Sequence, residues 1–228
     1  MPYKWLLFDL DGTLFDYDRA EQNALRSAFE QMGIPYQESY LPLYHEINHG
    51  LWLDFEKGAI DQARLRLQRF ELLFEAIDAR CDLPALSANY LIHLANSGFL
   101  MADAEDTVKT LHGQVDLAAI TNGLTDVQGP RLARSSLGGY FKAVIISEEV
   151  GSAKPSPEIF DTAFARMGHP ARGEVLIVGD SLTSDIQGGH DYGIDTCWFN
   201  PGGMAHDGVP STFEIRRLAE LIQIVQDV

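Results

Sequence analysis

The sequence has no long uninterrupted apolar run, which is the first feature that limits its function. None of its runs approaches the roughly 18 apolar residues that indicate a membrane-spanning helix. The opening stretch, MPYKWLLFDLDGTLFD, is interrupted after a few apolar residues by Asp9 and Asp11, whereas a secretory signal needs about 7–15 in succession. We therefore expect a cytoplasmic protein with no membrane partner.

Cysteine is almost absent as well. Only Cys81 and Cys197 occur, far apart and without CxxC spacing, so the sequence has neither a disulfide framework nor a cysteine-based zinc site. We expect two reduced cysteines that pack as small apolar side chains.

Basic side chains are few. The 228 residues include 17 Lys and Arg against 33 Asp and Glu, a formal net charge of −16. Such a surface repels phosphate backbones and anionic membranes, which argues against a nucleic acid polymer as partner. A small phosphorylated metabolite is also an anion, so a site that binds one must supply its own positive charge.

The order of short apolar runs and helical patterns along the chain indicates an α/β fold. Hydrophobic residues make up 46% of the chain, which is ordinary for a globular protein. Five short apolar runs are typical of buried parallel strands, and helical patterns lie between the later ones, the clearest beginning at Ser156-Pro157. This alternation predicts a Rossmann-like, doubly wound parallel sheet. The expected strands cover 6–10, 117–121, 143–147, 175–179 and 196–199.

About 105 residues separate the first two expected strands, too many for one crossover helix. The apolar residues of that stretch recur at helical spacing, as at Phe70, Phe74 and Ile77. We therefore predict an α/β core formed by 1–15 and 99–228, with an inserted α-helical cap at 16–98.

Two neighbouring carboxylates follow the first strand, in the sequence DLDGTLFD. Asp9 and Asp11 are two positions apart on an extended segment, so their side chains point the same way. Gly12 then permits a sharp turn, which Thr13 can bond. An ordinary turn would explain one Asp and the Gly, but two adjacent carboxylates also suit acid–base chemistry.

Three further motifs each follow an expected strand, at the edge where open α/β sheets bind ligands. In ITNG, Thr121 and the backbone N–H of Asn122 can hold phosphate oxygens. Lys154 precedes a Pro-led helix and could by itself be a solvated charge. Asp180 and Asp185 flank the loop GDSLTSD, and their oxygens suit Mg²⁺.

Together, these four motifs in this order resemble the haloacid dehalogenase-like superfamily, and the helical insertion resembles its small α-helical cap. The resemblance implies that Asp9 is the nucleophile, Asp11 the general acid and base, and Thr121, Asn122 and Lys154 the phosphate-binding group. It further implies a Mg²⁺ cofactor held by Asp9, the backbone carbonyl of Asp11 and Asp180, with Asp185 a ligand or its support.

The implied activity is hydrolysis of phosphate monoesters through an aspartyl-phosphate. The acid at Asp11 weakens a dehalogenase interpretation, because halide leaves without a proton. A phosphomutase stays open, and a catalytically silent relative is disfavoured because Asp9, Lys154 and Asp180 are all present.

The cap segment NHGLWLDFEKGAI (48–60) resembles that of bacterial pyrimidine 5′-nucleotidases. This favours a nucleoside monophosphate as substrate, with sugar phosphates and phosphoglycolate as alternatives. Trp52, Phe55 or Phe15 could stack on a base, and Asn48 or His49 could bind its edge. The spacing of three between Trp52 and Phe55 on a helix favours the alternative that both belong to the cap core. The oligomeric state is open.

Overall fold

A six-stranded sheet forms the centre of the molecule in the computed structural model, which describes residues 3–205 and 208–227. All neighbouring strands are parallel, in the order β3-β2-β1-β4-β5-β6. The predicted α/β fold with a doubly wound parallel sheet is therefore confirmed. The strands are β1 (Trp5–Phe8), β2 (Asp116–Thr121), β3 (Ala143–Ile146), β4 (Val175–Gly179), β5 (Asp195–Phe199) and β6 (Phe213–Ile215).

Two differences from the expected strands have local causes. The first strand ends at Phe8, before the expected Leu10, because the chain turns through Gly12 at a φ of 84°. The edge strand β6 was not predicted. It has three residues, Phe213–Ile215, too few for alternation to distinguish a strand from a loop.

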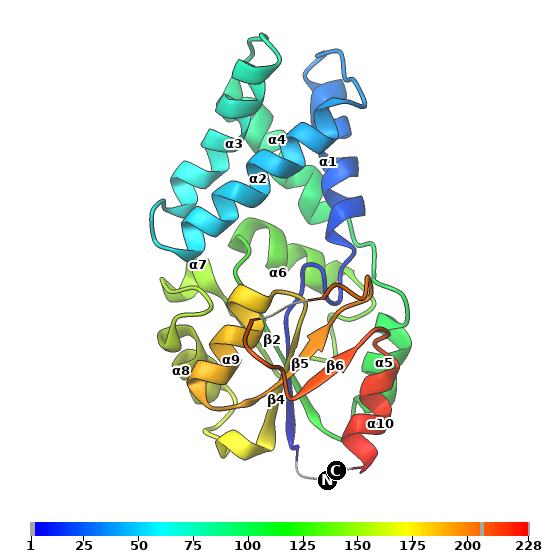
Figure 1. The fold of residues 1–228 in the computed structure, drawn as a ribbon. Coiled ribbons are helices and arrows are strands. Elements are labelled where there is room, and N and C mark those ends of the chain that lie inside the picture. Colours follow the sequence, from blue (N-terminus) through cyan, green and yellow to red (C-terminus); the bar gives the residue numbers. More distant parts are fainter. Residues whose placement is uncertain (1–2, 206–207, 228) are drawn as a thin grey trace.

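Helices cover both faces of the sheet (Figure 1). Successive side chains of β1 point to opposite faces, so Leu6 and Phe8 enter the buried cluster that includes α5 and α10, while Leu7 enters the one that includes α8 and α9. The helices of this part are α5 (Ala104–Leu111), α6 (Thr125–Arg134), α7 (Ser147–Val150), α8 (Pro157–Arg166), α9 (Gln187–Tyr192) and α10 (Glu220–Asp227), with short turns η1 (Arg172–Glu174) and η2 (Leu182–Ile186).

The first four helices after β1 stand over the carboxyl ends of the strands (Figure 1). They share a separate buried cluster rich in aromatic rings, in which Tyr44 and Phe70 stack with centroids 5.6 Å apart. Aspartate side chains cap three of the four N-termini. The helices are α1 (Tyr17–Gln31), α2 (Tyr40–Glu56), α3 (Gln62–Ala76) and α4 (Leu83–Asn96).

The two connections to these helices run side by side. Asp16 N–H donates to the Phe99 carbonyl at 3.0 Å, and Met101 N–H donates to the Leu14 carbonyl at 3.0 Å. The four helices fall inside the segment 16–98, and the division into a core of 1–15 and 99–228 and a cap of 16–98 stays a prediction. No helix within the described parts of the chain combines the length and apolar character needed to cross a membrane.

Candidate active site

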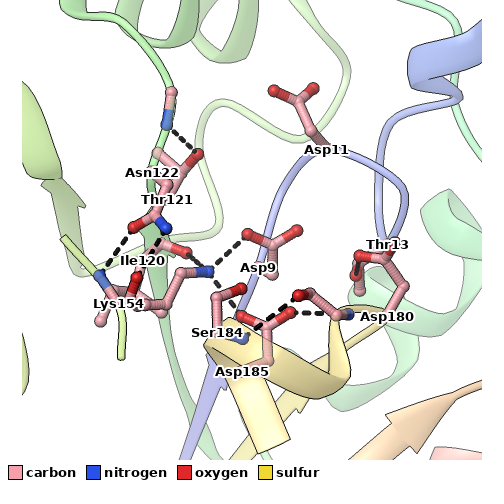
Figure 2. A network of polar contacts seen from close by, with 12 residues as sticks. Asp9, Asp11, Thr13, Ile120, Thr121, Asn122, Lys154, Asp180, Ser184 and Asp185 are labelled. Carbon is pink, nitrogen blue, oxygen red and sulfur yellow. Dashed lines mark hydrogen bonds and ion pairs between the residues drawn. The ribbon is translucent and has the colours of Figure 1, made fainter. Parts of the chain in front are cut away.

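The four motifs meet at the carboxyl edge of the sheet. Strand β1 lies between β2 and β4, and Phe8 is in register with Ala119 and Val178. The residues that follow these strands are therefore brought together, although Asp9 is more than 100 positions from those that follow β2 and β4. Figure 2 shows side chains of all four motifs around Asp9 and Lys154.

Lys154 is the centre of this cluster. Its side chain is 1% exposed, and its ammonium nitrogen lies 2.6 Å from Asp9 Oδ1, 2.6 Å from Asp185 Oδ1 and 2.9 Å from the Ile120 carbonyl oxygen. An ammonium group has three hydrogens, so all three are bound within the protein. Lys154 is thus a buried cation that joins the first and last motifs, and the solvated-charge alternative is wrong.

Glycines make room for the two acids of the last motif. A Cβ at Gly12 would lie 2.5 Å from Asp180 Oδ2, and one at Gly179 would lie 2.2 Å from Asp185 Cγ. Thr13 Oγ1 donates to Asp180 Oδ1 at 3.1 Å, and Ser181 N–H donates to Asp185 Oδ2 at 3.1 Å. Both acids are therefore held in place by neighbouring side chains and backbone.

Asp9, Asp180 and Asp185 form the group that can hold a metal ion: one oxygen from each lies within 4.8 Å of the others. The cluster places three carboxylates against one ammonium group. Burial raises the pKa of Asp180 to about 7, and the Asp185 carboxylate adds to the shift. Burial also raises the pKa of Asp9 well above its ordinary value, although Lys154 opposes this. A hard oxygen donor set with uncompensated negative charge fits a divalent cation such as Mg²⁺.

Thr121 and Asn122 lie beside this cluster. Thr121 Oγ1 accepts from Gly123 N–H at 3.0 Å, which leaves the hydroxyl hydrogen as a donor. The Asn122 side chain has a different role from its backbone: Nδ2 donates to the Lys154 carbonyl at 2.9 Å, and Oδ1 accepts from Lys154 N–H at 2.8 Å. This reciprocal pair fixes the Lys154 loop to the ITNG loop.

Asp11 stands apart from the acidic cluster. Figure 2 shows its carboxylate pointing the same way as that of Asp9 but away from Lys154 and Asp180. Its partners come from α6: Arg131 pairs with one oxygen, and Gln128 Nε2 donates to the other at 2.5 Å. Sequence analysis missed both partners. Their spacing of three on the helix after ITNG was the available signal.

The four residues expected to contact a substrate base have different positions. Asn48 is 2% exposed and its Nδ2 donates to Glu21 Oε1 at 2.7 Å and to Tyr17 Oη at 3.1 Å. His49 is exposed. Phe15 has no exposed surface and lies in the core of the sheet under Arg131.

Trp52 is half-buried and makes an edge contact with Phe55, with ring centroids 5.7 Å apart. Neither ring belongs to the buried cluster of α1–α4. Among the candidate aromatic residues, Trp52 therefore retains accessible surface while Phe15 does not.

Glu56 is a further residue of this region that sequence analysis did not single out. It ends α2, and its Oε2 accepts from Thr183 Oγ1 of η2 at 3.0 Å. Burial raises its pKa, and Asp185 adds to the shift. The helical segment therefore contacts the loop that carries Asp180 and Asp185.

The class of protein follows from a family model of haloacid dehalogenase-like hydrolases, which matches residues 3–193. The chain belongs to this family of hydrolases, as the four motifs had indicated. It is 37% identical to the pyrimidine 5′-nucleotidase PynA of Streptococcus pneumoniae, over 97% of this chain and 94% of the other. It is 34% identical to the pyrimidine 5′-nucleotidase YjjG of Escherichia coli, over 99% of both chains.

Among solved structures, the chain is similar to the HAD-hydrolase YfnB of Bacillus subtilis. The two share 38% identity with a TM-score of 0.92, and the match covers 99% of each chain. In that crystal structure YfnB is bound to magnesium, and the structure reveals interdomain movement.

Proposed function

We propose that this protein is a Mg²⁺-dependent phosphohydrolase that cleaves nucleoside 5′-monophosphates, pyrimidine ones above all, through a phosphorylated Asp9. The observation that carries this proposal is the position of Asp9. Asp9 is 6% exposed, and its carboxylate is bound by the Lys154 ammonium and adjacent to two further acids at the carboxyl edge of the sheet.

In the first step, Asp9 forms a bond to phosphorus while the bond from phosphorus to the leaving oxygen breaks. Asp11 gives its proton to that oxygen, which leaves as an alcohol. In the second step, Asp11 takes a proton from the water that attacks phosphorus, and Asp9 is released with phosphate. Covalent catalysis divides one slow reaction into two faster ones, with one acid–base group serving both.

Phosphate binding falls to three groups near Asp9: the Thr121 hydroxyl, the Asn122 backbone N–H and the Lys154 charge. Burial opposes the charged form of Lys154, but Asp185 and Asp9 raise its pKa, so it remains an ammonium group. Because its three hydrogens are engaged with protein oxygens, it acts on phosphate through its charge and by holding Asp9 in place.

Asp9, Asp180 and Asp185 would hold the Mg²⁺ ion, together with the Asp11 carbonyl. The three carboxylates balance the charge of one Mg²⁺ and Lys154. When bound, Mg²⁺ supplies positive charge that lets a dianionic phosphate approach acidic side chains. The carboxylate of Asp11, which is paired with Arg131 instead, is left for proton transfer.

The substrate class is supported by the similarity to PynA and YjjG, which extends over nearly the whole chain and so includes α1–α4. Trp52, on the helix that ends at Glu56 beside the site, offers an aromatic surface for a base. Asn48 is 2% exposed and its Oδ1 is buried without a hydrogen-bond partner among the described residues, so its position does not support a contact with the base.

Phosphate release from a panel of monoesters tests the proposal. The panel contains pyrimidine and purine nucleoside 5′-monophosphates, sugar phosphates and phosphoglycolate, each assayed with Mg²⁺, with EDTA and with Asp9→Asn protein as the blank. We expect Mg²⁺-dependent release, fastest on pyrimidine monophosphates.

The other outcomes separate the parts of the proposal. Fastest release from a sugar phosphate or phosphoglycolate would retain the chemistry and reject the nucleotide assignment. Isomerisation of a sugar phosphate without release would indicate a phosphomutase, and no reaction with any ester would reject phosphohydrolase activity.

A further inference from the structure

The side chain of Asp11 is held by two residues of α6. Gln128 Nε2 donates to one carboxylate oxygen at 2.5 Å, and the Arg131 guanidinium pairs with the other. The same Arg131 nitrogen donates to Gln128 Oε1 at 3.0 Å, which closes a three-residue ring of contacts. Each carboxylate oxygen has its own donor and keeps a second lone pair.

Arg131 is itself fixed in place. Its guanidinium is fully buried and lies over the Phe15 ring, 4.4 Å from the centroid. Among the described residues, Asp11 is the acidic side chain that pairs with Arg131. Within the same residues, Nε and Nη1 of Arg131 have no hydrogen-bond partner. Hydrogen bonds from a charged donor are strong, so Arg131 holds the Asp11 carboxyl group in one orientation, and the remaining lone pairs of its oxygens can still carry the transferred proton.

Gly123 leaves the space through which Gln128 reaches Asp11. A Cβ at Gly123 would lie 2.1 Å from Gln128 Nε2 and 2.7 Å from its Cδ. Gln128 is 1% exposed, so its amide is surrounded by protein. The glycine of ITNG thus serves Asp11 through Gln128, a role that a simple turn would not require.

Resting on the proposed function, we infer that Gln128 and Arg131 are positioning residues for the acid and base Asp11. An aspartate side chain can adopt several rotamers, and proton transfer requires its oxygen within hydrogen-bond reach of the leaving group and of the attacking water. The pair on α6 selects the rotamer from which both transfers proceed. Among the described residues, the side-chain hydrogen bonds of Gln128 and Arg131 go to Asp11 and to each other, and none goes to Thr121, Asn122 or Lys154.

Steady-state kinetics of Arg131→Met and Gln128→Met test this inference, with Arg134→Met as the matched control. Arg134 lies one turn further along α6, is exposed, and donates to Asn96 Oδ1 at 2.6 Å. The substrates are uridine 5′-monophosphate, whose leaving group needs a proton, and p-nitrophenyl phosphate, whose leaving group does not. Each variant is also combined with Asp11→Asn.

We expect Arg131→Met to lower kcat on the nucleotide by more than about tenfold, since small misplacement of a catalytic group costs up to about 10²-fold. KM should stay within about threefold of the wild-type value, and kcat on p-nitrophenyl phosphate should fall less than kcat on the nucleotide. Arg134→Met should have the kcat and KM of the wild type. In the Asp11→Asn background, Arg131→Met should cause no further loss, because the group that it positions is gone.

An equal loss on both esters, or a full loss in the Asp11→Asn background, would overturn the positioning role while the wild-type activity still supports the proposed function. A wild-type protein inactive on both esters would defeat the proposed function and this inference with it. If thermal unfolding shows that Arg131→Met does not fold, Gln128→Met and Gly123→Ala decide the question. A normal kcat in both variants would overturn the inference. A loss of kcat that occurs when Asp11 is present, and is absent when Asp11→Asn is also introduced, would support it.

Discussion

Asp9 and Asp11 are two positions apart in the sequence, yet their surroundings differ in kind. Asp9 is buried beside Lys154 and two other acids, whereas the Asp11 side chain is 25% exposed and pairs with Arg131. Two carboxylates in unlike environments can take unlike roles. This difference is consistent with the proposed division, in which Asp9 is the nucleophile and Asp11 the acid–base group.

Replacing Asp9 tests the nucleophile. We expect Asp9→Asn to lower turnover by at least about 10³-fold, because the covalent route disappears. The fold should persist, since Lys154 keeps its contact with Asp185. Phosphate release and circular dichroism measure the two effects, and near-normal release would contradict the covalent mechanism.

Replacing Asp11 tests the acid. Proton transfer from a placed side chain contributes about 10²–10⁴-fold, so Asp11→Asn should slow nucleotide hydrolysis by an amount in that range. Hydrolysis of p-nitrophenyl phosphate should fall less, because its leaving group needs no proton. Parallel assays of the two esters decide the matter, and equal losses would show that Asp11 does not protonate the leaving group.

At the scale of elements, α3 connects the four-helix segment to the first turns of α6 and α7, beside the site. Arg66 of α3 lies 3.0 Å from Asp126 of α6 and 2.8 Å from Glu148 of α7. Glu148 in turn accepts from Thr125 N–H at 2.7 Å, and Gln62 Nε2 donates to Ser147 Oγ at 3.1 Å. These contacts join α3 to the ends of the loops that follow β2 and β3.

Arginine substitutions on α3 measure how much these contacts with α6 and α7 stabilise the protein. Arg66→Met should lower the free energy of unfolding by about 1 kcal/mol, because a partly buried cation loses two charged partners. The Arg64 side chain binds Glu71 and Gln68 of its own helix, so Arg64→Met should cost less than about 0.5 kcal/mol. Denaturant unfolding compares the two, and equal effects would mean that the contacts across to α6 and α7 contribute nothing.

At the scale of the whole molecule, a net charge of −16 makes the entry of any anion depend on local positive charge. Asp9, Asp180 and Asp185 concentrate negative charge further. The protein is therefore expected to be more stable with a divalent cation than without one, quite apart from turnover.

Thermal unfolding measures this effect. At 100 times its dissociation constant, a ligand of the folded state adds about 2.7 kcal/mol, which for a chain of this size raises Tm by roughly 5–10 °C. We expect Mg²⁺ to produce such a shift relative to EDTA, and Asp180→Asn to diminish it. Sodium chloride at equal ionic strength is the control; an equal shift with sodium chloride would indicate screening of charge and no metal site.

The sequence alone determined the α/β fold, the helical insertion and the residues of the four motifs. It could do so because these features are local: buried strands are continuous apolar runs, helices repeat every three or four residues, and each motif follows its strand within a few positions. The helical pattern expected to begin at Ser156-Pro157, for example, is α8, and its apolar side chains are buried.

Only the tertiary structure decided which distant residues complete the site. Pairing of β1 with β2 and β4, and of β2 with β3, brings Lys154 onto Asp9 and sets Gln128 and Arg131 against Asp11. The contact of α2 with η2 sets Glu56 against Thr183. The tertiary structure also places Phe15 out of reach of a substrate, buried under Arg131. The physical reason is that contacts between side chains depend on strand order and register, and no spacing along one segment encodes these.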